Sequence, residues 1–189
     1  MEQLDLKFAV VDVETTGGAG LLNRITEIGI VLLDGLREVG TFHSLVDPCT
    51  PITPYVRNLT GITDEMVRGK PQFSELADNL SHLFDGRIFV AHNVQFDCRM
   101  VSSEFKRAGI KFDPPRLCTV KLSRRVFPGF ASYSLNNLTA SLGLPGFNHH
   151  RAMDDTYACA EILKLALEKV GSKRILAEAK NLKKFNSTI

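Results

Sequence analysis

The chain has 189 residues, of which 44% are hydrophobic and 23% charged, with a formal net charge of +2 at pH 7. This composition is typical of one globular domain and excludes a disordered or fibrous protein. No apolar run reaches membrane-spanning length, and the N-terminal sequence MEQLDLKF is unlike a signal peptide. Because the four cysteines are scattered without a CxxC pair, we expect reduced thiols, a cytoplasmic location and no membrane partner.

The first predicted element is a buried strand from Lys7 to Val13, rich in Val, Phe and Ala and free of Gly and Pro. Asp12 and Glu14 lie two residues apart at its end, so both carboxylates project from the same face. Two like charges repel each other there, and a cation between them would remove that conflict. Hard oxygen ligands at this spacing favour Mg²⁺ or Mn²⁺. The alternative is a strand that simply ends in polar residues before the turn at Gly17.

Four further strands are expected along the chain. The first two of them are joined by a hairpin turn at Asp34-Gly35 and should pair in an antiparallel manner. The strand at residues 87–91 is expected to be short and buried. The four strands are predicted at residues 24–34, 37–46, 87–91 and 116–120.

Short helices are expected between and after these strands. Pro71 fits the first residue of the longest one, which should end at Asp85-Gly86. Prolines before it mark a loop that contains two helical pieces. These helices are predicted at residues 55–59, 64–68, 71–85, 121–126 and 135–142.

A longer amphipathic helix should follow the strand at residues 87–91, with Asn93 as its N-cap and Gly109 after its end. Asp97 lies beside the apolar stripe of this helix, so we expect its carboxylate to face the sheet. The alternative is an exposed first-turn acid that is favoured by the helix dipole. The stripe consists of Val94, Cys98, Val101, Phe105 and Ala108.

The last long helix starts after the pair His149-His150 and carries a second inward acid. Asp155 shares a row with the apolar stripe, whereas Asp154 shares a row with charged residues and should face solvent. The small residues of the stripe would let the helix pack close to the sheet. That stripe consists of Ala152, Thr156, Cys159, Leu163, Ala166 and Val170.

Four carboxylates thus occupy positions where apolar side chains would be expected: Asp12, Glu14, Asp97 and Asp155. Carboxylates that converge at the carboxyl ends of strands can hold two metal ions that clamp a phosphodiester. A histidine beside them can deprotonate the attacking water. His149 and Asp154 have the same spacing as His150 and Asp155, so spacing alone does not select between the two pairs.

Three motifs in this order resemble those of the DEDDh 3′→5′ exonucleases of the RNase H-like superfamily, which include RNase T, oligoribonuclease and the proofreading epsilon subunit of bacterial DNA polymerase III. D-x-E-T-T-G matches residues 12–17, H-N-x-x-F-D matches residues 92–97, and H-R-A-x-x-D matches residues 150–155. LTGIT at residues 59–63 resembles a further signature. Ala152 at the small position of the third motif selects His150 and Asp155. The related tyrosine subfamily would have Tyr where Arg151 stands.

The resemblance covers about residues 8–170 and implies an α/β fold, an RNase H-like mixed five-stranded sheet with helices on both faces. It implies that His150 is the general base and that the metal ligands hold two Mg²⁺ or Mn²⁺ ions. Those ligands would be Asp12, Glu14, Asp97 and Asp155.

The resemblance also implies residues that bind the terminal nucleotide. Thr15, Thr16 and the adjacent backbone would hold it, and Leu21, Leu22 or Phe96 would pack against its base. The alternative interpretation of Phe96 is that it only packs in the hydrophobic core. His92 is expected to be structural, because it precedes its helix without an inward acid partner.

The activity implied is metal-dependent 3′→5′ removal of nucleoside 5′-monophosphates from single strands. The DVETTG form favours DNA, in proofreading or repair, and any DNA polymerase subunit would have to bind in trans. RNA 3′-end processing is the alternative, and a catalytically silent nucleic-acid or polymerase-binding module is the rival from another class.

The basic residues are concentrated at the C-terminal end of the chain. Residues 171–189 carry five basic residues and one acid, a charge of 5 − 1 = +4, which leaves 2 − 4 = −2 for the rest. We therefore expect an exonuclease domain at residues 1–170 and a basic helical tail at residues 171–189. The tail could meet a phosphate backbone or a partner, or be a solvated end.

Overall fold

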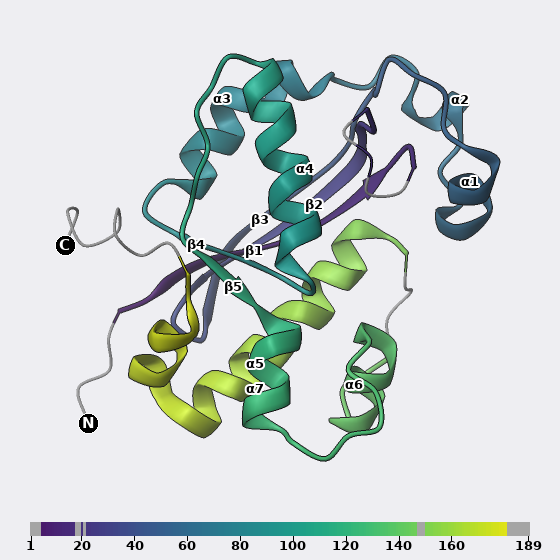
Figure 1. Ribbon diagram of the computed structural model, residues 1–189. Coiled ribbons are helices and arrows are strands. Elements are labelled where there is room, and N and C mark those ends of the chain that lie inside the picture. The colour runs from purple at the N-terminus through teal and green to yellow at the C-terminus, as the bar shows by residue number, and fades with distance from the viewer. Residues whose placement is uncertain (1–4, 18–19, 21, 147–149, 181–189) are drawn as a thin grey trace.

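The computed structural model describes residues 5–17, 20, 22–146 and 150–180, and its centre is one mixed β-sheet (Figure 1). The strands follow the order β3-β2-β1-β4-β5 across the sheet. β1, β2 and β3 pair in an antiparallel manner, whereas β4 is parallel to β1 and β5 is parallel to β4. The predicted mixed five-stranded sheet is therefore confirmed. Its strands are β1 (Lys7–Thr15), β2 (Ile25–Asp34), β3 (Arg37–Leu45), β4 (Ile88–Ala91) and β5 (Arg116–Cys118).

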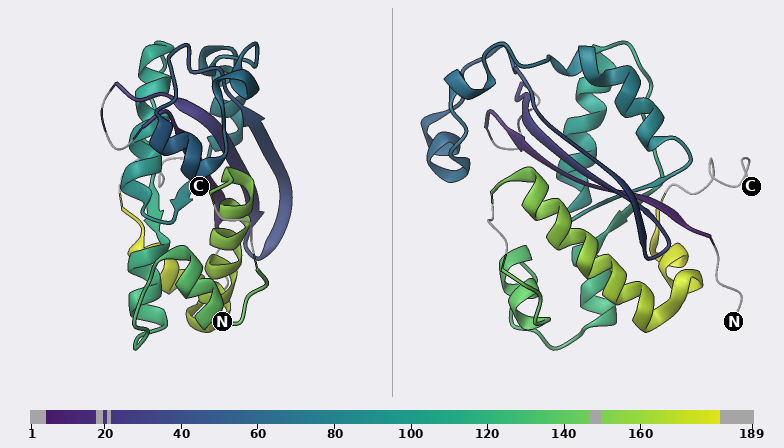
Figure 2. Two further views of the ribbon diagram at one scale, coloured as in Figure 1. Left: turned by 90° about the vertical axis from the view of Figure 1, so that its right-hand side faces the viewer. Right: turned by 180° about the vertical axis from the view of Figure 1, so that it is seen from behind.

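Helices cover both faces of the sheet, as predicted. The apolar residues of α3 and α4 join one core cluster, and those of α5 and α7 join a second cluster on the opposite face. In the right-hand view of Figure 2 the sheet runs diagonally between these two groups of helices. The helices are α1 (Pro54–Thr60), α2 (Asp64–Val67), α3 (Phe73–Phe84), α4 (Val94–Arg107), α5 (Thr119–Val126), α6 (Leu135–Ser141) and α7 (Ala152–Glu178).

Two strand boundaries differ from those predicted. β1 continues to Thr15, so Glu14 lies inside the strand instead of after it. β5 ends at Cys118, and the two β-branched residues that suggested a longer strand open α5. The reason is that β4 ends at Ala91, which is the register partner of Cys118. Beyond that pair β5 has no strand to bond with, and the chain turns into a helix.

Two predicted helix starts are also wrong in detail. Pro71 is not the first residue of α3, because Gln72 is the N-cap and forms a capping box with Glu75. Asn93 occupies the N-cap position of α4, but its side chain makes no capping hydrogen bond. It adopts the left-handed conformation instead, with φ of 80°, which redirects the chain sharply from β4 into α4.

α7 packs unusually close to β2, and a glycine permits this. A Cβ atom added at Gly29 would lie 2.7 Å from the carbonyl oxygen of Ala152, the first residue of α7. Ala152, Thr156 and Cys159 are buried along this contact, as the small residues of the predicted stripe indicated. Gly29 was not predicted to have this function.

The end of the chain packs onto the domain as far as it is described. α7 contains a non-helical residue at Gly171, and Ile175 beyond it is fully buried in the cluster under α5 and α7. Lys180 then pairs with Arg116 in an antiparallel bridge at the outer edge of β5. All four cysteines are free thiols, and Cys98 and Cys159 are buried as expected. Among the described residues, no helix is long and apolar enough to cross a membrane.

Candidate active site

The four predicted carboxylates come from three elements that meet where β1 extends past β4. The last register pair between these strands is Val10 with Val90, so the part of β1 that carries Asp12 and Glu14 projects beyond β4. The first turn of α4 fills that space and brings in Asp97, whose Oδ1 accepts a hydrogen bond from the Val13 N–H at 3.3 Å.

The first turn of α7 contributes the fourth carboxylate from the other side. Asp155 is only 8% exposed, whereas its neighbour Asp154 is half-buried, so the helix face predicted to point inward does so. The backbone N–H of His150 donates to Asp155 Oδ2 at 3.0 Å, which ties the loop before α7 to the helix. His149, the other candidate base, lies outside the described residues.

Burial and mutual repulsion disfavour the ionised forms of these acids. Burial, followed by the charges of Asp97, Asp155 and Glu14, raises the pKa of Asp12 well above its usual value. Burial and the same kind of repulsion raise the pKa of Glu14 to about 8. Burial also raises the pKa of Asp97 to about 7. A positive charge is therefore missing from this cluster, and a cation would stabilise it.

The donor set fits a hard divalent cation. One ligand atom each from Glu14, His150 and Asp155 lies within 4.8 Å of the other two. Asp97 is close enough to Asp12 for its charge to raise the pKa of Asp12. Carboxylate oxygens are the protein ligands typical of Mg²⁺ and Mn²⁺ sites. His150 itself adopts a left-handed backbone conformation, with φ of 67°, which is uncommon for a residue other than glycine.

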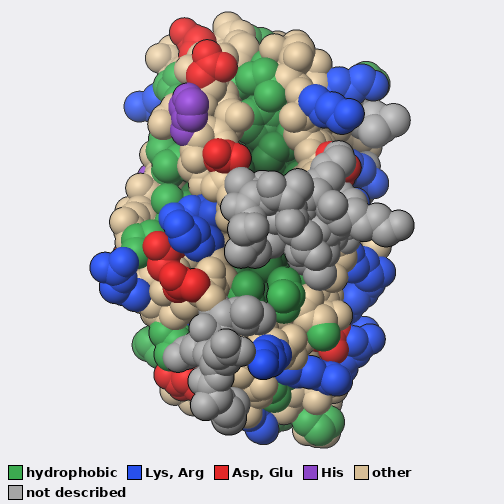
Figure 3. All heavy atoms as spheres, turned by 90° about the vertical axis from the view of Figure 1, so that its left-hand side faces the viewer, with side chains coloured by type: hydrophobic (Ala, Val, Ile, Leu, Met, Phe, Trp, Pro, Cys, Tyr) green, Lys and Arg blue, Asp and Glu red, His purple; other side chains and the backbone are tan. Residues whose placement is uncertain are grey.

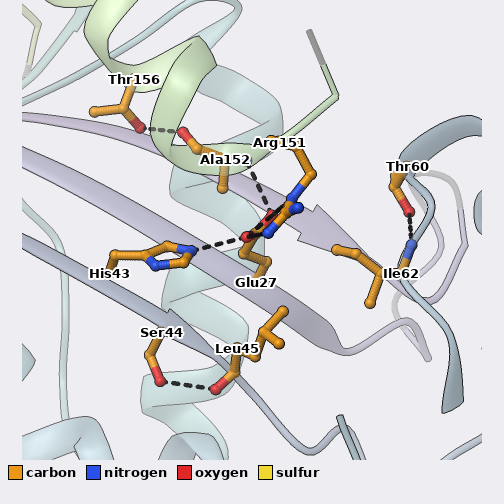
Figure 4. Close-up of polar contacts among 9 residues, drawn as sticks. All are labelled: Glu27, His43, Ser44, Leu45, Thr60, Ile62, Arg151, Ala152 and Thr156. Atoms are coloured by element: carbon orange, nitrogen blue, oxygen red, sulfur yellow. Dashed lines mark hydrogen bonds and ion pairs between the residues drawn. The ribbon is translucent and has the colours of Figure 1, made fainter. Parts of the chain in front are cut away.

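A further acid beside the cluster, Glu27, was missed by the sequence analysis (Figure 4). It is fully buried on β2, yet both of its carboxylate oxygens have partners. Arg151 Nη2 donates to Oε1 at 2.8 Å, and His43 Nε2 lies 2.8 Å from the same atom. The Ala152 N–H donates to Oε2 at 3.0 Å. Burial alone would raise the pKa of Glu27, but these hydrogen bonds outweigh it and lower the pKa. Glu27 thus anchors the start of α7, which carries Asp155 and follows directly after His150.

A signal for Glu27 was present in the sequence. It is an acid within the apolar run ITEIGIVLL, on the same strand face as Gly29, and it stands directly opposite Glu14 in the pairing of β1 with β2. Arg151, which occupies the position of the tyrosine in the related subfamily, is its ion-pair partner.

The predicted nucleotide-binding residues differ in how far they are exposed to solvent. Thr15 and Thr16 are buried, and their hydroxyl groups close the turn after β1: Thr15 Oγ1 donates to the Gly17 carbonyl oxygen at 2.5 Å, and the Arg24 N–H donates to Thr16 Oγ1 at 3.1 Å. Their predicted contact with a nucleotide would have to come mainly from the backbone of this turn.

Among the apolar candidates, Leu22 is 90% exposed beside that turn, and Phe96 is half-buried against the core of α3 and α4. Leu21 lies outside the described residues. His92 has the structural role expected of it, because its Nδ1 is 3.0 Å from Thr119 Oγ1 and its Nε2 is 2.9 Å from the Tyr133 carbonyl oxygen. These contacts connect the end of β4 to α5.

A family model described as exonuclease matches residues 9–163. The chain is 36% identical over 183 residues to the 3′-5′ exonuclease DinG of Staphylococcus saprophyticus, and 35% identical over 167 residues to a PolC-type DNA polymerase III of Caldanaerobacter subterraneus. These matches cover 93% and 88% of this chain but only 20% and 12% of the two relatives. The chain therefore spans a fifth or less of the length of these curated relatives.

Two solved structures resemble this one closely. Exonuclease X in complex with 5′ overhanging duplex DNA gives a TM-score of 0.68 at 32% identity, and the match covers 88% of this chain and 93% of that chain. The zinc-bound complex of Escherichia coli exonuclease I with single-stranded DNA gives a TM-score of 0.79 at 23% identity, covering 92% of this chain and 42% of the other. At the latter identity the likeness shows the fold alone. The predicted RNase H-like fold is confirmed by these neighbours.

Proposed function

The chain belongs to the exonuclease family, and we propose that it is a metal-dependent 3′→5′ exonuclease that releases nucleoside 5′-monophosphates from single-stranded DNA. The observation that carries the proposal is the convergence of four carboxylates with uncompensated charge beside His150. Such a cluster has no structural benefit without a cation, and phosphodiester hydrolysis is the chemistry that clustered divalent cations support.

We propose that two Mg²⁺ or Mn²⁺ ions are held by Asp12, Glu14, Asp97 and Asp155. When bound, the ions would supply a Lewis acid for the phosphoryl oxygens and lower the pKa of a bound water. The chain's own groups would orient these ligands: the Val13 N–H fixes the Asp97 carboxylate, and the His150 N–H fixes that of Asp155.

His150 is proposed to take the proton from the attacking water, since its imidazole lies beside Glu14 and Asp155 on an exposed edge of the cluster. Glu27 would support this function indirectly, because it holds Arg151 and the Ala152 N–H and so fixes the backbone on which His150 stands. The exposed side chain of Leu22 and the half-buried ring of Phe96 are proposed to contact the terminal base, and the turn of Thr15 and Thr16 to hold its sugar.

DNA is proposed as the substrate because the similar proteins include a 3′-5′ exonuclease, a DNA polymerase III and an exonuclease bound to DNA. The PolC-type relative supports a proofreading function beside a DNA polymerase. We further propose that residues 1–170 are the catalytic unit and residues 171–189 its basic tail. The free thiols support a location of the protein in the reducing cytoplasm.

One assay tests the proposal. Single-stranded DNA and RNA of the same sequence, labelled at the 5′ end, are incubated with the protein and Mg²⁺ or Mn²⁺. We expect a ladder of DNA products shortened from the 3′ end, release of 5′-mononucleotides, and complete inhibition by EDTA. Preferred cleavage of RNA would identify an RNA-processing enzyme, and turnover in excess EDTA would contradict the metal mechanism. Binding of DNA without cleavage would indicate a catalytically silent module.

A further inference from the structure

A groove of about 760 Å³ lies over β5, outside the carboxylate cluster. Its walls come from three parts of the chain that are far apart in sequence: the first turn of α4, one side of α5, and the segment at residues 177–180. None of the catalytic candidates lines it.

The groove is strongly cationic. Four basic side chains line it, against the single acid Glu178. Glu178 is already neutralised, because it forms ion pairs with Arg125 and Arg174. The four basic residues are Arg116, Lys121, Arg125 and Lys180.

Two of these cations are available to a ligand. Lys121 and Lys180 are exposed, and neither enters an ion pair within the described part of the chain. Lys121 and Arg125 are four residues apart on α5 and therefore share one face of the helix. Figure 3 shows Lys and Arg side chains gathered along the right-hand edge of the face that it draws.

The groove and the carboxylate cluster share one element, the first turn of α4. The α4 wall of the groove is formed by Asn93, Val94 and Gln95, and Asp97 follows Gln95 by two residues, or about 3 Å along the helix axis. Because residues two apart point to different sides of a helix, a strand whose 3′ end lies at Asp97 would pass around the first turn of α4 to reach the groove. The carboxylates repel phosphates, so a nucleic-acid strand needs compensating positive charge close by, and the groove supplies it.

We infer that this groove binds the sugar–phosphate backbone of the substrate strand, upstream of the nucleotide being removed. The inference rests on the proposed function, because it assigns a path to the strand whose 3′ end lies among the carboxylates. Phosphates of successive nucleotides would contact Lys121, Lys180 and the paired guanidinium of Arg125. Such contacts carry no sequence information, so the groove would bind any single strand.

The test uses the full-length double variant Lys121→Gln/Lys180→Gln. Its matched control is Arg37→Gln/Lys70→Gln, which removes the same charge from exposed positions on β3, at the opposite edge of the sheet, and on the loop before α3. Binding of a fluorescein-labelled twelve-nucleotide oligothymidylate is measured by anisotropy in EDTA, at a series of salt concentrations. Each phosphate contact adds about 0.7 to the slope of log affinity against log salt for a single strand. The groove variant should lose about 1.4 from this slope, and the control should retain the slope of the unmodified protein.

Turnover gives a second readout. A dinucleotide has a single internucleotide phosphate, which is the one that is cleaved, and leaves none for Lys121 and Lys180. The ratio of kcat/KM for the oligomer to kcat/KM for the dinucleotide should therefore fall about tenfold in the groove variant. The control should keep the ratio of the unmodified protein.

An unchanged slope and ratio in the groove variant would overturn the inference, and so would equal losses in both variants, which would indicate a diffuse charge effect. An equal loss of binding to polyglutamate would assign the groove to acidic peptides and overturn the nucleic-acid assignment. The anisotropy measurement requires no catalysis. Absence of turnover in the unmodified protein would therefore contradict the proposed function without deciding the role of the groove.

Discussion

Glu14 and Glu27 stand opposite each other on β1 and β2, on the same face of the sheet, and have opposite electrostatic properties. Glu27 is the more deeply buried of the two, yet its pKa is lowered, whereas the pKa of Glu14 is raised to about 8. The difference lies in their partners. Glu27 has Arg151, His43 and the Ala152 N–H, whereas Glu14 faces Asp155, Glu27 and Asp97. Burial alone therefore does not decide whether an acid is ionised.

Glu27 and Glu14 therefore have different functions within one small region. The positive charge that stabilises Glu27 comes from the protein itself, and Glu27 consequently holds the start of α7 in place. The positive charge that would stabilise Glu14 and its neighbours has to come from solution, which is the property of a metal site.

The largest effect is expected from Asp12→Ala, which removes one member of the uncompensated cluster. Activity should fall by about 10³-fold or more, because the metal ions contribute several kcal/mol to transition-state stabilisation. The metal-free protein should fold normally, since the change relieves repulsion. Oligonucleotide turnover and thermal unfolding in EDTA check both parts. Near-normal activity, or gross unfolding, would show that Asp12 is not a ligand.

The next effect is expected from His150→Ala, which removes the proposed base. Turnover should fall by about 10²- to 10⁴-fold, the usual contribution of a general base. Mn²⁺ titration should show that metal binding is largely retained, whereas Asp155→Ala should weaken it. His149→Ala and Asp154→Ala are the matched controls and should keep most of the activity. If the controls prove to be the sensitive pair, the assignment of the inward face of α7 is wrong.

Glu27→Gln should destabilise the protein by about 1.5–3 kcal/mol, the value of hydrogen bonds to a charged group. The loss should not reach that of a fully buried charge left unpaired, because the side chains of Arg151 and His43 are 43% and 42% exposed and can be hydrated. Urea unfolding in EDTA measures the difference. A gain in stability would mean that Glu27 resembles Glu14, and the contrast between them would disappear.

The last prediction concerns the stability of the metal-free protein after Glu14→Gln. This change should stabilise the protein, whereas Glu27→Gln should destabilise it. Because the folded pKa of Glu14 is raised from 4.5 to about 8, its stabilising contribution is present below the lower value and is lost as pH rises through the upper one. Without metal, the variant should therefore equal the unmodified protein in stability near the acidic end of the range and have the higher Tm above about pH 8. Melting curves in EDTA at both ends of this range test the prediction. A stability advantage at acidic pH only would contradict the assigned shift.

The sequence by itself identified the four carboxylates that we propose as ligands, because each is recognisable from local periodicity. Alternation along one strand places Asp12 and Glu14 on the same face, and helical spacing turns Asp155 inward and Asp154 outward. The five strands followed from the same local patterns, whereas the mixed sheet with helices on both faces was implied by the family resemblance.

Only the tertiary structure decided features that depend on which distant segments meet. Glu27 finds Arg151 at a separation of 124 residues, and Gly29 is needed because Ala152 lies against it. The end of β5 is set by the length of β4 and not by its own β-branched residues. The groove likewise requires α4, α5 and the end of the chain to come together. The physical reason is that side-chain periodicity is a property of neighbours in sequence, whereas charge compensation and close packing depend on contacts that form only in the folded chain.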